Sequence, residues 1–168
     1  MSAAPKVEIC NLTSLDLPAV IGLVEMLEEL PRWPTDFYES LVNPDPPVER
    51  IVLVAVSGAG EASTRNVCGF VVASLVSPEA ELESIAVARD AQRRGIGRRL
   101  LFELIEKLRG RQIERVRLEV RSSNGPAMGL YKSFGFRIVG SRPRYYSDPV
   151  DDAILMELDF GEAAVRLF

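Results

Sequence analysis

Residues 91–100 read AQRRGIGRRL, so that two arginine pairs enclose two glycines where an apolar helical pattern begins. Glycine allows the backbone to curl with its N–H groups pointing outward. The first turn of a helix adds further backbone donors and a partial positive charge, which together favour phosphate. Nearby arginines would raise the positive potential further: Arg93, Arg94, Arg98 and Arg99. The alternative is a surface turn whose arginines are simply solvated.

This stretch matches neither of two better-known nucleotide loops. The GxxxxGK[ST] spacing of a Walker loop, with its lysine and hydroxyl, is missing. A GxGxxG dinucleotide loop would need a glycine where Leu100 stands. The phosphate interpretation therefore depends on Gly95, Gly97 and the arginines around them.

The distribution of charge along the 168-residue chain also favours an anionic ligand near this loop. The net charge is −4, yet residues 89–121 hold 11 basic and 5 acidic side chains, whereas residues 1–50 hold 3 basic and 9 acidic ones. We therefore expect an anionic ligand in the middle of the chain and a cationic one near the acidic first part. An isoelectric point near 5.0 and the lack of a recognised motif argue against direct nucleic-acid binding.

The residue types argue against a metal centre, a disulfide framework and a membrane span. The chain has no histidine, and Cys10 and Cys68 lack the spacing of metal ligands. The longest apolar runs, such as IVLVAV at 51–56, have the length of a strand. The first residues lack the basic start and apolar stretch of a secretory signal. We therefore expect a cytoplasmic protein with reduced thiols, no metal and no membrane partner.

Apolar periodicity predicts alternating strands and helices in a single α/β domain over residues 1–168. A helix over 17–30, capped by Ser14 or Asp16, carries an apolar stripe at Val20, Leu23, Val24 and Leu27. The order predicts a mixed, mostly antiparallel, twisted sheet flanked by helices. Strands are expected at 6–12, 50–56, 67–76, 81–87, 115–121, 136–141 and 153–160, and further helices from 35 or 36, after 95, and over 124–135.

The segment SIAVARDAQRRGIGRRLL resembles the signature of the GNAT superfamily of N-acetyltransferases, whose pattern is Gln/Arg-x-x-Gly-x-Gly/Ala and stands here as Gln92 to Gly97. Two later segments, LEVRSSNGPAMGLYKSFGF and RPRYYSDPVDDAILMEL, resemble the bacterial RimI-like ribosomal-protein alanine N-acetyltransferases. The resemblance is specific over roughly residues 80–160. Before that it depends on the order of the elements and on PRWP at 31–34, which is similar to a tryptophan-containing segment of the family. It implies a GNAT-type domain whose acetyl-CoA-binding core covers about residues 80–140.

The resemblance implies acetyl-CoA as the co-substrate. The loop would hold its pyrophosphate, and a strand would run beside the pantetheine arm, where a backbone N–H near Val87 can polarise the acetyl carbonyl. A donor fixed at a developing oxyanion typically lowers the barrier by about 3 kcal/mol. Asn124 matches a cofactor-binding position of the family, with a helix N-cap as the alternative. The cofactor-binding candidates are Ile85, Ala86, Val87, Arg93, Arg94, Gly95, Ile96, Gly97, Arg98 and Asn124.

The implied chemistry needs a base for the amine and an acid for the leaving thiolate. Without histidine, the base has to be a carboxylate working through water or a less usual group, and the resemblance assigns it to Glu119. From the alternating pattern alone, an ion pair between Glu119 and a neighbouring arginine is favoured. Tyr131 matches the acid, a role that suits a phenol of pKa near 10, with a core aromatic as the alternative. Glu81 and Glu83 are secondary base candidates, or parts of a solvated strand edge.

The acceptor implied by the resemblance is the N-terminal amine of a protein, such as a ribosomal protein with a basic tail. The substrate-binding candidates are Trp33, Glu83, Tyr145 and Tyr146. An acidic set could line a route for such a tail or form a solvated helix face: Glu25, Glu28, Glu29, Asp36 and Glu39. Neither cysteine lies in a nucleophile setting, which favours direct transfer. The alternatives are a small-molecule amine acetyltransferase and a non-catalytic acyl-CoA-binding module.

Overall fold

The computed structural model describes residues 6–27, 30, 32–58 and 65–161. Within these residues the chain forms two compact units. The first comprises the chain up to Ser74 together with Glu83–Lys107, and the second comprises Leu75–Leu82 with the chain from Leu108 onward. The strand order of the sheet is β1-β2-β3-β4-β5-β7-β6.

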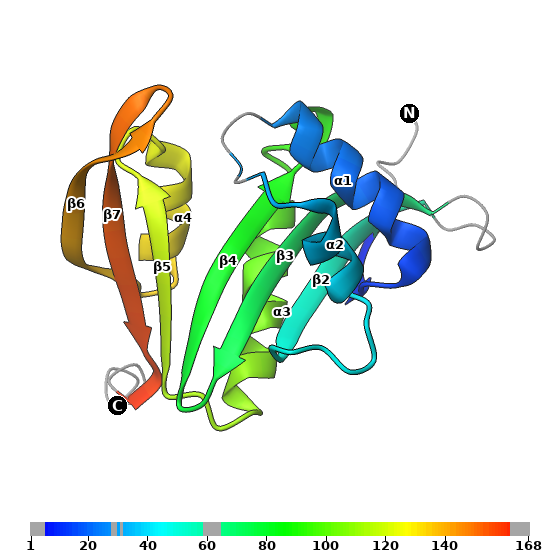
Figure 1. Ribbon diagram of the computed structural model, residues 1–168, viewed down its shortest axis with the longest axis horizontal. Helices are drawn as coiled ribbons and strands as arrows, with labels where there is room; N and C mark the ends of the chain where they lie inside the picture. Colours follow the sequence, from blue (N-terminus) through cyan, green and yellow to red (C-terminus); the bar gives the residue numbers. More distant parts are fainter. Residues whose placement is uncertain (1–5, 28–29, 31, 59–64, 162–168) are drawn as a thin grey trace. The chain divides into compact units, whose positions relative to one another are not determined.

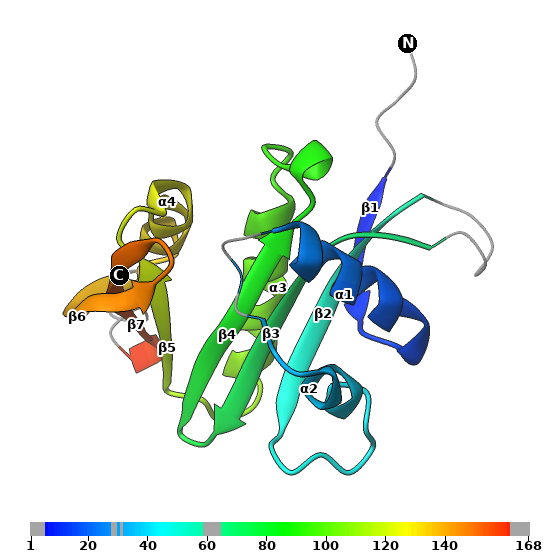
Figure 2. The same ribbon diagram turned by 45° about the horizontal axis from the view of Figure 1, so that its top comes forward.

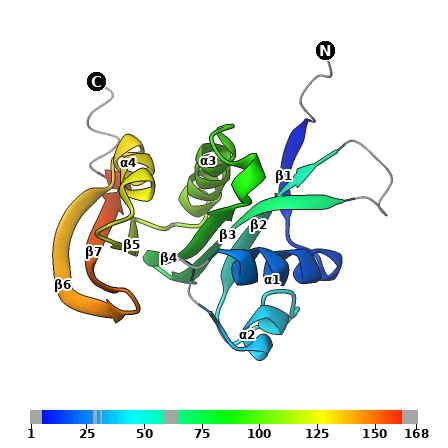
Figure 3. The ribbon, with the colours of Figure 1, turned by 90° about the horizontal axis from the view of Figure 1, so that it is seen from above.

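The first unit is built on three antiparallel strands and the second half of β4. Figures 1 and 3 show α1 and α2 on one face of β2 and β3, and α3 on the opposite face. The short 3-10 helix η1 leads into α1, and η3 leads toward α3. The elements are β1 (Val7–Asn11), η1 (Ser14–Asp16), α1 (Leu17–Met26), α2 (Thr35–Ser40), β2 (Arg50–Ser57), β3 (Asn66–Val76), β4 (Glu79–Val87), η3 (Arg89–Ala91) and α3 (Ile96–Arg109).

Apolar burial explains why these elements form. Phe70 and Val54, at the middle of β3 and β2, are fully buried, as is Val20 of α1. These side chains belong to one core cluster that also includes buried residues of α1 and α2. Figure 2 shows the backbone of α1 and α2 from another angle. The predicted helix after residue 95 is confirmed, and its apolar side chains at helical spacing are buried: Leu100, Leu101, Leu104, Ile105 and Leu108.

The second unit contains β5 (Arg115–Arg121), α4 (Gly125–Ser133), β6 (Arg137–Ser147) and β7 (Val150–Asp159). The start of β4 pairs with β5 in parallel, whereas β7 pairs with both β5 and β6 in antiparallel fashion. This combination confirms the predicted mixed, mostly antiparallel sheet. The predicted alternation of β5 is also confirmed, because its apolar face is buried and its charged face is not: Val116, Leu118 and Val120 against Arg115, Arg117, Glu119 and Arg121.

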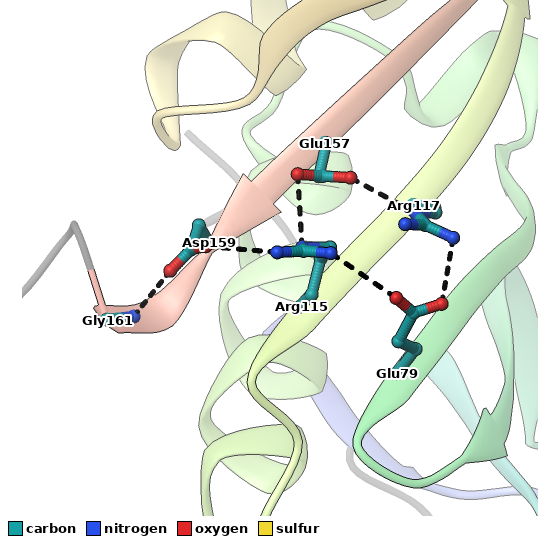
Figure 4. A network of polar contacts seen from close by, with 6 residues as sticks. All are labelled: Glu79, Arg115, Arg117, Glu157, Asp159 and Gly161. Atoms are coloured by element: carbon teal, nitrogen blue, oxygen red, sulfur yellow. Dashed lines mark hydrogen bonds and ion pairs between the residues drawn. The ribbon is translucent and has the colours of Figure 1, made fainter.

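The charged face of β5 carries a network of ion pairs that joins three strands (Figure 4). Arg117 contacts Glu79 of β4 at 2.8 Å and Glu157 of β7 at 3.1 Å. Arg115 contacts the same two carboxylates and also Asp159 at 3.6 Å. Each of these partly exposed ion pairs contributes little to stability on its own. Because they share partners, however, they fix the register of β4 and β7 on either side of β5.

Two predictions about the first helix are wrong. The helix ends at Met26 rather than at residue 30, because Leu27 has an extended backbone with φ −111° and ψ 100°. Leu27 is nevertheless buried, so it fits the apolar stripe of the predicted helix although its backbone is not helical. The α1 helix also lacks a side-chain cap, because the Asp16 carboxylate turns back to accept bonds from the Thr13 N–H and hydroxyl at 2.9 and 2.8 Å. In the connection between β2 and β3, residues 59–64 lie outside the described residues.

Candidate active site

The glycine–arginine loop of the first unit has the curled backbone that its sequence predicts. Gly95 has φ +76° and Arg93 has φ +62°, so two nearby residues adopt the left-handed conformation that turns the chain sharply. Helix α3 then begins at Ile96, which is buried, while Arg93, Arg94 and Gly95 are exposed. The loop therefore presents a helix start and positive side chains to solvent, an arrangement that suits an anionic ligand.

The strand that leads to this loop is held by an unusually close approach. A Cβ placed on Gly69 of β3 would lie 2.8 Å from the carbonyl oxygen of Ala86 and 3.3 Å from a methyl of Leu100. Gly69 therefore lets β4 and α3 pack tightly against β3. The end of β4 is fixed again by Gln92, whose side-chain amide donates a hydrogen bond to the carbonyl of Val87 at 3.0 Å. Of the predicted pantetheine-binding residues, Ala86 is buried and Ile85 and Val87 are half-buried.

Glu119 lies on the charged face of β5 in the second unit and forms an ion pair. Its carboxylate is 2.6 Å from the guanidinium of Arg142, which belongs to β6. The pattern-based alternative of an ion pair is therefore what the structure shows, but the partner is two strands away, because β7 lies between β5 and β6. The Glu119 side chain retains 27% exposure, so it can still meet a substrate or a water molecule.

Tyr131 is buried on α4, and its ring lies 5.7 Å from that of Phe136. The core position that the helical spacing predicted is thus confirmed. The expected phenol pKa near 10 is wrong, because burial raises the pKa of Tyr131 well above its usual value and Tyr146 raises it further. At neutral pH the hydroxyl is protonated, which is the state that a proton donor requires.

Asn124 caps α4, as its alternative interpretation predicted. Its side-chain oxygen accepts a hydrogen bond from the backbone N–H of Ala127 at 3.2 Å. The two preceding serines are held by Asp151 of β7: the Ser123 hydroxyl donates to the carboxylate at 2.6 Å, and the Ser122 hydroxyl donates to its other oxygen. Asp151 therefore ties the start of α4, with Asn124 and Tyr131 on it, to the β6–β7 hairpin.

The tyrosine pair of β6 packs against two arginines, Arg121 at Tyr146 and Arg142 at Tyr145. The rings of Tyr145 and Tyr146 meet edge to face at 5.2 Å. The Arg121 guanidinium lies 4.1 Å from the centre of the Tyr146 ring and also donates hydrogen bonds to the carbonyls of Asp148 and Pro149. Burial raises the pKa of Tyr146, and Glu119 adds to the rise, so this hydroxyl is protonated as well.

Glu83 forms a nearly buried ion pair, so the solvated strand edge expected as its alternative is wrong. Its carboxylate binds Arg50 of β2 through two nitrogen atoms at 2.8 and 3.3 Å, and the two side chains are 18% and 14% exposed. The Arg50 guanidinium also lies 4.9 Å from the centre of the Phe37 ring, which packs on Trp33 at 4.2 Å. Trp33, predicted to bind substrate, thus belongs to one aromatic and charged cluster with Glu83.

Replacing Arg50 with Ala should lower the free energy of unfolding by about 2 kcal/mol, because it leaves the nearly buried Glu83 carboxylate without its partner. For a chain of this size, that change corresponds to a fall in Tm of about 4–8 °C in a thermal melt. A matched control is Lys6→Ala, which breaks the exposed pair with Glu8 and should change stability by less than about 0.5 kcal/mol. Equal shifts in Tm for both variants would contradict the interpretation that Arg50 compensates the nearly buried charge of Glu83.

The acidic residues proposed to guide a basic tail are only partly visible. Glu25, Asp36 and Glu39 are exposed, as expected either for a guiding surface or for a solvated helix face. Glu28 and Glu29 lie outside the described residues. In the part of the chain with described positions, no group of three His, Cys, Asp or Glu side chains could hold a metal ion. In that same part, no helix has the length and apolar character to cross a membrane.

Sequence reasoning did not identify Arg142, Arg121 or Asp151. Arg142 reaches Glu119 across an intervening strand, and no local spacing indicates such a contact. Asp151 follows the tyrosine pair by five residues and is separated from the apolar part of β7 by Asp152, so a charged residue at a hairpin was the only available signal.

Replacing Asp151 with Asn should destabilise the protein in a pH-dependent manner. Hydrogen bonds from Ser122 and Ser123 lower the pKa of Asp151 from 3.8 to about 2. A carboxyl group whose pKa is lowered by folding stabilises the fold above its ordinary pKa, and this contribution disappears as the pH falls toward the lowered value. The Tm difference between wild type and Asp151→Asn should therefore be constant from pH 5 to 7 and shrink from pH 4 toward pH 2. A difference that is the same at pH 3 and pH 6 would contradict this role.

Comparison with known proteins gives a consistent result. The family model described as "Acetyltransferase (GNAT) family" matches residues 15–136. The [ribosomal protein bS18]-alanine N-acetyltransferase of Escherichia coli strain K12 is 35% identical over 152 residues, covering 89% of this chain and 95% of the relative.

Solved structures agree with this match. The crystal structure of the ribosomal-protein-S18-alanine N-acetyltransferase from Escherichia coli has a TM-score of 0.74 and 32% identity, covering 92% of this chain and 94% of that one. Arabidopsis thaliana NAA60, solved in complex with acetyl-CoA, has a TM-score of 0.82 at 20% identity, covering 93% and 99%. The second match shows a shared fold.

Proposed function

Because this chain belongs to the acetyltransferase (GNAT) family, we propose that it transfers an acetyl group from acetyl-CoA directly to the N-terminal α-amine of a protein such as a ribosomal protein. That it is an N-acetyltransferase follows from its family and its relatives. The observation that carries the choice of acceptor is the 35% identity to an alanine N-acetyltransferase, which extends over 95% of that relative. We treat residues 1–168 as one catalytic domain with its cofactor-binding core at about 80–140.

The first unit supplies the residues that would bind acetyl-CoA. The curled backbone at Gly95, the start of α3 with Gly97 in its first turn, and the exposed arginines Arg93, Arg94 and Arg98 would hold the pyrophosphate. The buried side chain of Ile96 anchors the loop in the core. The backbone of Ile85, Ala86 and Val87 would run beside the pantetheine arm.

The second unit supplies the acid and the base. Glu119 would take a proton from the acceptor's ammonium group, directly or through a water molecule. The neutral amine then attacks the thioester carbonyl, and the negative charge that develops on the carbonyl oxygen would be met by the backbone N–H near Val87. Tyr131 would donate its hydroxyl proton as the carbon–sulfur bond breaks, so that coenzyme A leaves as the thiol. Asn124 would contribute a hydrogen bond to the cofactor while it caps α4.

The residues proposed to bind the acceptor are Trp33, Glu83, Tyr145 and Tyr146. Tyr145 and Tyr146 are on β6, and Trp33 lies with Glu83 in the aromatic and charged cluster of the first unit. An acceptor with a basic tail agrees with the exposed acidic side chains of Glu25, Asp36 and Glu39. Since such proteins and acetyl-CoA meet in the cytoplasm, we expect the chain to act there.

The experiment that tests this function has two parts. Isothermal calorimetry should detect binding of coenzyme A to the folded protein, and an acceptor panel should then be compared by release of the free thiol. We expect an alanine-initiated basic peptide to be acetylated at its α-amine, as located by mass spectrometry, and polyamines to react much more slowly. Preferential acetylation of the polyamines would make this a small-amine acetyltransferase. Binding of coenzyme A without turnover of any amine would leave an acyl-CoA-binding module.

A further inference from the structure

The carboxylate of Glu119, proposed as the base, is paired with a cationic side chain of the protein itself. The Arg142 guanidinium lies 2.6 Å from a Glu119 oxygen through a single nitrogen atom, Nη1. No other carboxylate pairs with Arg142 among the residues that the structure describes. The contact joins one nitrogen to one oxygen and lacks the two-pronged geometry that makes arginine–carboxylate pairs strong.

Arg142 is suited to leave this contact. Its side chain is 52% exposed, so water can replace the carboxylate at low cost. Its guanidinium also lies 5.4 Å from the centre of the Tyr145 ring, where a cation is attracted by the face of the aromatic system. Arg121, the other arginine of this region, is held more firmly, because it is bound by two backbone carbonyls as well as by the Tyr146 ring.

The acceptor carries the same kind of charge as Arg142. An α-amino group has an ordinary pKa near 8, so most of it arrives as an ammonium ion at neutral pH. An ammonium ion and a guanidinium cannot both take the exposed position on one carboxylate without repulsion. The two cations therefore compete for Glu119.

We propose that Arg142 is the resting counter-ion of Glu119, and that the acceptor's ammonium group displaces it onto the Tyr145 ring before the proton is removed. This inference depends on the proposed function, since it takes Glu119 as the base. Arg142 is then a positioning residue: it holds the carboxylate in place when no acceptor is bound, and an acceptor that brings its own positive charge takes its position.

Steady-state kinetics with an alanine-initiated basic peptide tests this inference. Arg142→Ala should lower the KM for the peptide by about two- to fivefold, the size expected for losing one exposed competing ion pair. The KM for acetyl-CoA should stay unchanged, and kcat should change by less than about twofold. Arg142→Lys, which keeps a cation, should restore most of the wild-type peptide KM. Arg144→Gln removes a positive charge from the same strand without touching Glu119 and is the matched control.

A double-mutant comparison shows whether Arg142 acts through Glu119. In a Glu119→Gln background, Arg142→Ala should no longer strengthen peptide binding, measured by calorimetry with coenzyme A present. An unchanged or higher peptide KM in Arg142→Ala, with wild type active, would overturn the inference and leave the proposed function standing. If the wild type acetylates no amine at all, the proposed function fails, and the inference fails with it.

Discussion

Combining Glu119→Gln with Tyr131→Phe should lower kcat by at least about a thousandfold while leaving the affinity for acetyl-CoA within about twofold. Each residue is proposed to move one proton, and a positioned acid or base typically contributes 10²- to 10⁴-fold to the rate. Neither substitution touches the glycine–arginine loop, which belongs to the first unit. The measurement pairs single-turnover acetylation of an alanine-initiated peptide with calorimetric titration of coenzyme A.

The single variants should show how the two roles combine. The effects of residues that act as a unit are not additive, so each single substitution should cost a large part of the total effect. Glu103→Gln, which removes an exposed carboxylate from α3, is the matched control and should retain wild-type turnover. If the double variant acetylates the peptide at the normal rate, Glu119 and Tyr131 are not the base and the acid.

The elements of the fold could be predicted wherever apolar spacing decides the structure. The stripe on α3 and the alternation on β5 are examples, since each is fixed by burial of one face. The end of α1 could not be predicted, because Leu27 is buried in an extended backbone and burial does not distinguish it from a further helical turn. Element type therefore followed from periodicity, whereas the end of this helix did not.

The local backbone of the candidate site could be predicted from the sequence, but the contacts of its side chains could not. The curled loop at Gly95 follows from glycine chemistry and the helix start, both of which are local. The partners of the two acidic candidates are not local: Arg50 reaches Glu83 from β2, and Arg142 reaches Glu119 across β7. An alternating strand marks a charged residue as facing away from the core, but it does not say which charge of another strand that residue will meet.

Replacing Gly69 with Val should lower the free energy of unfolding by about 3 kcal/mol, or about 6–12 °C in Tm. The first atom of any side chain there would lie 2.8 Å from the Ala86 carbonyl oxygen, which is backbone and cannot rotate away. Either β3 or β4 must move, and the packing of α3 through Leu100 moves with it. Because Ala86 lies between two residues proposed to run beside the pantetheine arm, the KM for acetyl-CoA should rise as well.

Gly22→Ala is the control for the loss of a glycine as such. Apart from its chain neighbours and the nearby backbone of α1 itself, no heavy atom lies within 4 Å of the Cβ position at Gly22, so alanine should stabilise the helix by about 0.5–1 kcal/mol. If Gly69→Val lowers the free energy of unfolding and Gly22→Ala raises it, the Gly69 effect comes from the close approach of the strands rather than from chain flexibility. If Gly69→Val has the same Tm as the wild type, β4 can shift freely. The tight placement of Ile85 to Val87 would then no longer explain how the acetyl carbonyl is oriented.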